Sequence, residues 1–354
     1  MKKKNWILGL LLLAGLAAIV YFGRGRIHFN WHVFIEQIAQ VSWWRIAIGV
    51  SMIWLAYWIR AARWSVLLSP MKKSNWRETI GPQVIGYTGV ALLGRPADLM
   101  RPYLTAKKLK TTVSAQLAVY VVERMFDLDA FALIFSGLLS FAPDKKTMPH
   151  PELVRHFAMI GLIATIGVAV LAASVRLGGN AMARGSRSVS GGFAPKLGEG
   201  IASKILAFRS GLEVLASVRE VALAFGQSLL MWSMITVAYL ETAHAFAHSP
   251  QLHTLTLTRC MLLMGASMAA STVQLPVIGW FTQIAAVAAV FQGFFGVPAE
   301  PSLGCSAMLL IVTYLSVVPM GLIWARVERI SLREVAAESE HAGEVISEEK
   351  TQAL

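Results

Sequence analysis

Long apolar runs recur along this chain, and their length constrains its fold more than any other feature. Crossing the hydrocarbon core of a bilayer takes a helix of about 20 mostly apolar residues. We therefore predict an all-α polytopic membrane protein with about 8 transmembrane helices. The runs at 258–274 and 279–296 are short for a full crossing, which leaves the topology of 258–296 open. The apolar runs lie at residues 6–22, 45–67, 115–142, 157–175, 221–242, 258–274, 279–296 and 303–325.

The composition also indicates a lipid environment. Of the 354 residues, 56% are hydrophobic and 15% are charged. A soluble domain has about 45–50% apolar and about 25% charged residues, because its surface needs polar cover. The composition therefore excludes a cytosolic enzyme and a disordered chain. The two cysteines, Cys260 and Cys305, are too few for a secreted disulfide scaffold.

The distribution of lysine and arginine predicts the orientation. Five segments (the N-terminus, 60–77, 95–110, 176–219 and 326–333) carry 3, 5, 5, 7 and 3 basic residues, 23 in total, whereas the segments on the other side carry 7. Since cytoplasmic loops are enriched in basic residues, we expect both termini in the cytoplasm of a bacterial inner (plasma) membrane. The net charge of +12 is then explained by topology and anionic lipid, with no need for nucleic acid.

The organisation expected is one integral membrane domain over 1–325, with a first half over 1–142 and a second half over 157–325. A cytoplasmic loop at 176–219 contains apolar and basic residues at helical spacing. That spacing fits either an interfacial helix on the inner leaflet or a helix packed on the bundle. The tail at 326–354 is acidic and poor in bulky apolar residues, so we expect it to be cytoplasmic and disordered.

Two segments are rich in helix-breaking residues. Residues 79–94 are too short and too rich in glycine and proline to span, and basic residues flank both ends, which predicts a re-entrant hairpin. A similar interruption at 269–280 suggests an inverted repeat, although an ordinary proline kink explains it too. The residues expected to break the helices are Gly81, Pro82, Gly86, Gly89, Pro276 and Gly279.

Charged residues interrupt the apolar run at 115–142. Helical spacing places Glu123, Arg124 and Asp127 on one side, while Asp129 points elsewhere. A charge at the centre of a membrane helix costs about 2.5–3.5 kcal/mol, so such residues usually face a partner or a wet cavity. Two acids beside one base leave room for a further arginine from a neighbouring segment. The alternative is a cluster at the cytoplasmic end whose side chains reach water.

A second charged cluster, Arg95, Asp98 and Arg101, directly follows the glycine-rich segment. The planar fork of arginine suits phosphate, so these residues are candidates for holding a lipid phosphate, although positive charge on the cytoplasmic side alone also explains them. The residues expected to bind a lipid headgroup are Arg95, Asp98, Arg101, Glu123, Arg124 and Asp127.

Motifs for other chemistry are missing from the sequence. It has no phosphate-binding glycine loop with its lysine, no serine nucleophile elbow and no metalloprotease motif. Glu241, His244 and His248 share a helical face that suits a metal, but no second such pair occurs. We therefore expect no catalytic residue, no metal and no cofactor.

The two charged clusters resemble the transmembrane, flippase-like family of lysylphosphatidylglycerol synthases. That family has an Arg-x-x-acid-x-x-Arg stretch and then a helix with Glu-Arg-x-x-Asp, here Arg95 to Arg101 and Glu123 to Asp127. The resemblance covers most of 5–325. Asp98 replaces the more usual glutamate, and Pro276 to Gly279 lacks the fuller Pro-Gly-Gly pattern. The resemblance implies movement of a lipid between leaflets, and we expect no lipid synthesis because no aminoacyl-transfer domain is present.

These features favour a lipid-translocating membrane protein whose partners are anionic or glycosylated lipids. In that hypothesis Arg124 contacts the phosphate, and Asp127 orients the side chain of Arg124. An alternative is a non-transporting scaffold or accessory subunit for a lipid- or glycan-modifying enzyme, which would then be a protein partner. A third possibility, a membrane-embedded transferase, needs a base, for which His156 and His244 are candidates. The sequence leaves the oligomeric state undetermined.

Overall fold

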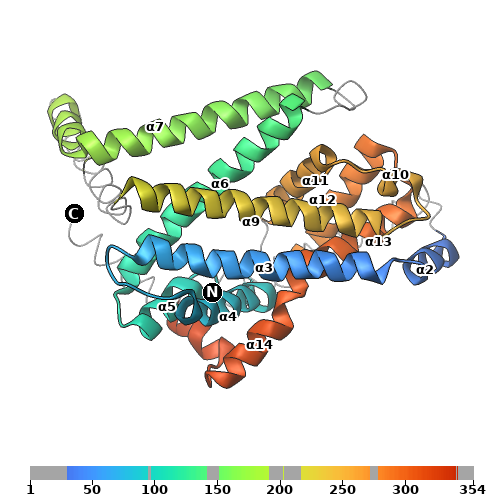
Figure 1. Cartoon of the computed structure of the whole chain (residues 1–354), viewed down its shortest axis with the longest axis horizontal. Coiled ribbons are helices and arrows are strands. Elements are labelled where there is room, and N and C mark those ends of the chain that lie inside the picture. Colours follow the sequence, from blue (N-terminus) through green and yellow to red (C-terminus); the bar gives the residue numbers. More distant parts are fainter. Residues whose placement is uncertain are drawn as a thin grey trace.

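The computed structural model confirms the all-α fold (Figure 1). It describes residues 30–94, 97–141, 151–190, 217–271 and 278–339, together with Ala202 and His341. Within these ranges every regular element is a helix. The elements are α2 (Trp31–Ala39), α3 (Trp43–Leu68), α4 (Trp76–Leu93), α5 (Met100–Leu109), α6 (Val113–Phe141), α7 (Pro151–Ser190), α9 (Val218–His244), α10 (Pro250–His253), α11 (Leu257–Ser271), α12 (Ile278–Phe295), α13 (Ala299–Leu310), the π-helical segment η2 (Ile311–Leu315) and α14 (Val317–Val327).

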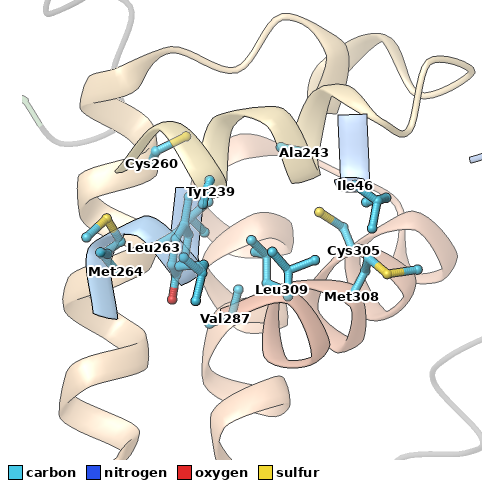
Figure 2. Close-up of a cluster of buried hydrophobic side chains, with 14 of the residues drawn as sticks. Ile46, Tyr239, Ala243, Cys260, Leu263, Met264, Val287, Cys305, Met308 and Leu309 are labelled. Atoms are coloured by element: carbon cyan, nitrogen blue, oxygen red, sulfur yellow. The ribbon is translucent and has the colours of Figure 1, made fainter. Parts of the chain in front are cut away.

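Helices α3 and α9 lie side by side along the long axis and form the central pair (Figure 1). Gly49 permits their close approach, since a Cβ there would lie 3.2 Å from the Oγ1 atom of Thr242 on α9. The main core joins this pair to α11, α12 and α13, and Figure 2 shows Cys260, Cys305 and Tyr239 inside it. On the other side of α3, the helices α4 and α5 pack together, and α14 covers α4.

Helix lengths agree with a membrane protein. Among the described residues, three helical stretches are long and apolar enough to cross a bilayer: Trp43–Leu68, Val218–His244 and Ala299–Val327. Helices α6 and α7 have 29 and 40 residues, which is also long enough to span. The predicted number of spans stays a prediction, and the run at 6–22 lies outside the described residues.

The expectation of a break within 79–94 is wrong. Helix α4 continues from Trp76 to Leu93, with a capping box of Asn75 and Glu78 at its start. The chain turns only at Gly94, whose positive φ of 75° favours glycine. Pro82 and the glycines of α4 therefore lie inside a continuous helix. Gly279 is the second residue of α12 and follows the undescribed residues 272–277, so the interruption expected there stays a prediction.

Close packing is what the glycines of α4 provide instead. A Cβ on Gly81 would lie 3.0 Å from the Trp324 ring of α14. A Cβ on Gly86 would lie 3.1 Å from the Cα atom of Arg101, and one on Gly89 would lie 3.0 Å from the Cε atom of Met100. These glycines let α5 and α14 approach the backbone of α4, so small size explains them better than helix breaking.

Two predicted boundaries also need correction. Helix α7 runs to Ser190, so the first part of the loop expected at 176–219 is helical. The tail expected to be disordered from residue 326 contains a helical segment at 332–339. In that segment Val335 and Ala336 are buried against Leu104 of α5, and this burial explains its order. Most of the second part of the 176–219 loop, where apolar and basic residues at helical spacing fit an interfacial helix, lies outside the described residues.

Candidate functional site

The carboxylates of Glu123 and Asp127 lie buried at the centre of the molecule. They are one helical turn apart on α6, and 0% and 3% of their surfaces are exposed. Arg63 of α3 joins them, with Nη2 at 2.8 Å from a carboxylate oxygen of Glu123 and Nη1 at 2.7 Å from one of Asp127. Arg63 also donates to the Oγ atom of Ser228 on α9 and is fully buried. Its guanidinium therefore holds α3, α6 and α9 together.

Arg101, at the start of α5, is the second buried cation of the cluster. Its Nη1 atom lies 3.1 Å from the other carboxylate oxygen of Glu123 and donates to the side-chain oxygen of Gln83 at 3.0 Å. Its guanidinium carbon lies 4.3 Å from the ring centre of Tyr87 and 4.9 Å from that of Tyr120. These cation–π contacts compensate for lost hydration of a buried arginine.

Arg60 and Arg124 make longer and weaker contacts. The Nη1 atom of Arg60 lies 3.7 Å from Glu123 and 3.8 Å from Asp127, and the Nη2 atom of Arg124 lies 3.5 Å and 3.4 Å from the same two residues. Both arginines donate to one phenolic oxygen, that of Tyr87. The side chain of Arg124 is 40% exposed. These two guanidiniums thus keep donor capacity for another anion.

The described cluster carries excess positive charge. Four arginines (Arg60, Arg63, Arg101 and Arg124) face two carboxylates, so two positive charges lack an acidic partner within it. Burying ions is costly unless they are paired and hydrogen-bonded. Glu123 and Asp127 are buried inside the bundle, so these two side chains do not reach water. The position of the cluster relative to the cytoplasmic end of the helix stays a prediction.

A cavity of about 460 Å³ adjoins the cluster. Arg60, Arg101 and Arg124 line it, whereas Arg63 does not. Its other lining residues from α3, α4, α5, α6 and the turn before α5 are Ile53, Ala56, Tyr57, Tyr87, Val90, Ala91, Gly94, Asp98, Tyr120, Asp127 and Leu128. Residues of α9, α11, α12 and η2 form the opposite wall, so the cavity lies between the two halves of the chain.

The structure brings most of the predicted headgroup residues to one place. Arg101, Glu123, Arg124 and Asp127 contact one another in the cluster, and Asp98 lines the adjoining cavity. Gly279 also lines the cavity. The predicted further arginine from a neighbouring segment is present, and it is Arg63. Arg95 and Pro276 lie outside the described residues.

Sequence reasoning missed the two arginines of α3. Arg60 and Arg63 were assigned to a basic cytoplasmic segment, yet 9% and 0% of their surfaces are exposed. Their spacing could have indicated that they are buried together. Two arginines three residues apart near the end of an apolar run share one helical face, where they need a common partner. Without them and the buried Arg101, the cytoplasmic total of basic residues is 20 against 7, so the charge asymmetry persists.

Two of the three residues considered for a metal, Glu241 and His244, have other partners. Arg45 forms an ion pair of 2.8 Å with Glu241, and the Nε2 atom of His244 is hydrogen-bonded to the backbone oxygen of Leu255 at 2.9 Å. The part of the chain that the structure describes has no group of three or more metal-binding side chains.

Comparison with known proteins gives one match. The family model described as the lysylphosphatidylglycerol synthase TM region matches residues 6–321 of the 354. No curated protein matches the chain, and no solved structure matches it either.

Proposed function

Because the chain belongs to the lysylphosphatidylglycerol synthase TM family, a family of membrane proteins of lipid metabolism and transport, we propose that it translocates a lipid between leaflets. The lipid is a phospholipid or a glycolipid with a phosphate in its headgroup. Arg60, Arg101 and Arg124 hold that phosphate, and Arg63 keeps the carboxylates of α6 in place.

The single observation that carries this proposal is the cavity with three arginines along one side. Arginine forms short, charge-assisted hydrogen bonds to phosphate oxygens, with two donors side by side. The volume of about 460 Å³ falls in the usual range of ligand sites, which is about 300–1,000 Å³. It accommodates a headgroup but not two acyl chains, so those chains stay in the bilayer.

The exposed side of α6 beside the cavity supports this placement of the acyl chains. Arg124 and Leu128, one turn apart, both line the cavity, and 60% of the Leu128 surface is exposed. In a membrane, an exposed leucine beside an arginine-lined cavity faces lipid tails. A lipid with its phosphate on Arg124 therefore has its chains next to hydrocarbon, whereas a free anion gains nothing from this arrangement.

Translocation is tested in proteoliposomes with a phospholipid that carries a fluorophore on one acyl chain. Dithionite quenches the outer leaflet, and the quenched fraction then reports movement across the bilayer. We expect faster exchange than in empty vesicles, and loss of this activity in Arg124→Ala. The matched control is Arg45→Ala, since Arg45 is a half-buried arginine of α3 that pairs with Glu241 outside the cavity.

Three results would contradict the proposal. Exchange equal to that of empty vesicles excludes translocation, and arginine-dependent lipid binding without exchange would favour the non-transporting scaffold. Normal exchange in Arg124→Ala would exclude the assigned phosphate site.

A further inference from the structure

The wall of the cavity that faces the arginines is uncharged. Of the described lining residues, the charged ones are Arg60, Asp98, Arg101, Arg124 and Asp127, and all of them come from α3, α5, α6 or the turn before α5. The helices α9, α11 and α12 and the segment η2 contribute none. Their lining residues are Trp232, Ile235, Tyr239, Met264, Ser267, Met268, Ser271, Gly279, Trp280, Gln283, Thr313 and Tyr314.

Neutral hydrogen-bonding groups are concentrated on this wall. The amide nitrogen of Gln283 on α12 donates to the Oγ atom of Ser267 on α11 at 2.5 Å. The hydroxyl of Tyr239 on α9 interacts with Ser267 and with Thr313 of η2. Figure 2 shows Tyr239 among the apolar side chains of α11 and α12, so packing fixes its position. A serine, a threonine, a tyrosine and an amide therefore form one positioned network.

Trp232 of α9 also belongs to this wall, although its indole Nε1 atom is itself shielded from the cavity. Its side chain is 92% buried, since only 8% of the residue surface is exposed, and it lines the cavity. Its indole Nε1 atom has no hydrogen-bond partner. The ring therefore adds packed apolar surface to this wall, and the hydrogen-bonding groups of the wall are those of Gln283, Ser267 and their partners.

We propose that the headgroup bound here carries hydroxyl groups, as in a phosphate linked to glycerol or a sugar, and not a cation. This inference rests on the proposed function and names its substrate class. The phosphate lies on the arginines, and the hydroxyls lie against Gln283 and the Ser267 network. Hydroxyls suit this wall because they both donate and accept, as the side chains opposite them do.

A cationic headgroup fits the cavity less well. An ammonium group buried in a site needs a carboxylate partner, and the wall formed by α9, α11, α12 and η2 has none among its described residues. Of the carboxylates that line the cavity, Asp127 is held by Arg63 at 2.7 Å. Asp98, the other carboxylate of the lining, has an interaction of its own, and it is the residue whose replacement tests ammonium binding. The three arginines on the other wall would also repel the ammonium group of the headgroup.

The test measures binding of four short-chain lipids to the purified full chain by native mass spectrometry. Phosphatidylinositol presents neutral hydroxyls beyond its phosphate, while phosphatidylethanolamine and lysyl-phosphatidylglycerol present ammonium groups. Phosphatidic acid presents the phosphate alone. We expect phosphatidylinositol to bind about tenfold more tightly than either ammonium lipid, the size expected from one or two added hydrogen bonds.

Single substitutions distinguish the contribution of the uncharged wall from that of the arginines. Gln283→Ala should weaken phosphatidylinositol about three- to tenfold and leave phosphatidic acid unchanged. Gln292→Ala, an exposed position on the same helix outside the cavity, should change neither. Asp98→Asn should leave phosphatidylinositol binding intact.

The outcomes distinguish this inference from the proposed function. Tighter binding of lysyl-phosphatidylglycerol that Asp98→Asn abolishes would overturn the inference and leave the phosphate site standing. Equal affinity for all four lipids, unaffected by Gln283→Ala, would overturn it as well. If none of the four lipids binds the native chain, the phosphate site itself fails.

Discussion

Arg63 offers the sharpest test of how the buried cluster is built. Its guanidinium lies 2.7 Å from Asp127, 2.8 Å from Glu123 and 2.5 Å from Ser228, with no exposed surface. Arg63→Met keeps much of the side-chain volume but removes all three contacts. Afterwards the closest cation to Asp127 is Arg124 at 3.4 Å, and Glu123 keeps Arg101 at 3.1 Å.

Removing one partner of a buried ion pair costs about 3–5 kcal/mol. Because other arginines remain near both acids, we expect the lower end, about 3 kcal/mol, which raises the unfolded-to-folded ratio about 150-fold. The assay is reversible unfolding in mixed micelles of increasing SDS content, followed by tryptophan fluorescence. The matched control is Arg124→Met. Its side chain is 40% exposed and lies 3.4–3.5 Å from the two acids, and its closest contact is a hydrogen bond of 3.0 Å to Tyr87, so a loss of about 1 kcal/mol is expected.

A double variant keeps this prediction testable even if Arg63→Met folds poorly. Asp127→Asn removes the acid that loses its closest partner, so combining it with Arg63→Met should restore about 1–2 kcal/mol. The reasoning is refuted if Arg63→Met is as stable as the native chain. It is also refuted if Arg124→Met destabilises the protein equally, because exposure and distance would then have no bearing on stability.

Three further changes test other parts of the structure. Gly321→Ala should destabilise the protein by about 1–3 kcal/mol, since the new Cβ would lie 2.6 Å from the backbone oxygen of Val84 on α4. Gly226→Ala, with nothing within 4 Å, should be neutral or stabilising in the same SDS titration. Tyr87→Phe removes the acceptor shared by Arg60 and Arg124, so both guanidiniums become available and phosphatidic acid should bind about two- to tenfold more tightly by native mass spectrometry. Val335→Asp should detach the helical segment 332–339 from α5 and expose it to limited proteolysis, while Ala337→Asp, at an exposed position, should leave the digestion pattern unchanged.

Spacing along one helix was enough to group part of the site. Glu123, Arg124 and Asp127 lie within two turns of a single apolar run, and helical geometry places them together whatever surrounds that helix. The cost of charge in hydrocarbon then required a partner from elsewhere. The grouping and the need for a partner both depend on local geometry and solvation, so both can be predicted from the sequence.

The sequence did not identify the arginines that pair with these acids, because the pairing depends on which helices pack together. Arg60 and Arg63 meet the acids of α6 only because α3 lies beside α6 and α9, and nothing in the run of α3 names those neighbours. The glycines of α4 were misread for the same reason. Glycine both breaks helices and permits close packing, and the choice between these roles is made by Arg101, Met100 and Trp324 on other helices.

The sequence by itself determined that this chain is helical, lies in a membrane and carries charges that need partners there. These properties follow from apolar run length, helical period and the cost of burying charge, which act within single segments. Only the tertiary structure decided which arginines are buried, and which of them keep donors for a ligand. It also placed the charged lining residues of α3, α5 and α6 across one cavity from an uncharged wall formed by α9, α11, α12 and η2. Those properties arise from contacts between segments far apart in sequence, and the pattern of any one helix does not encode them.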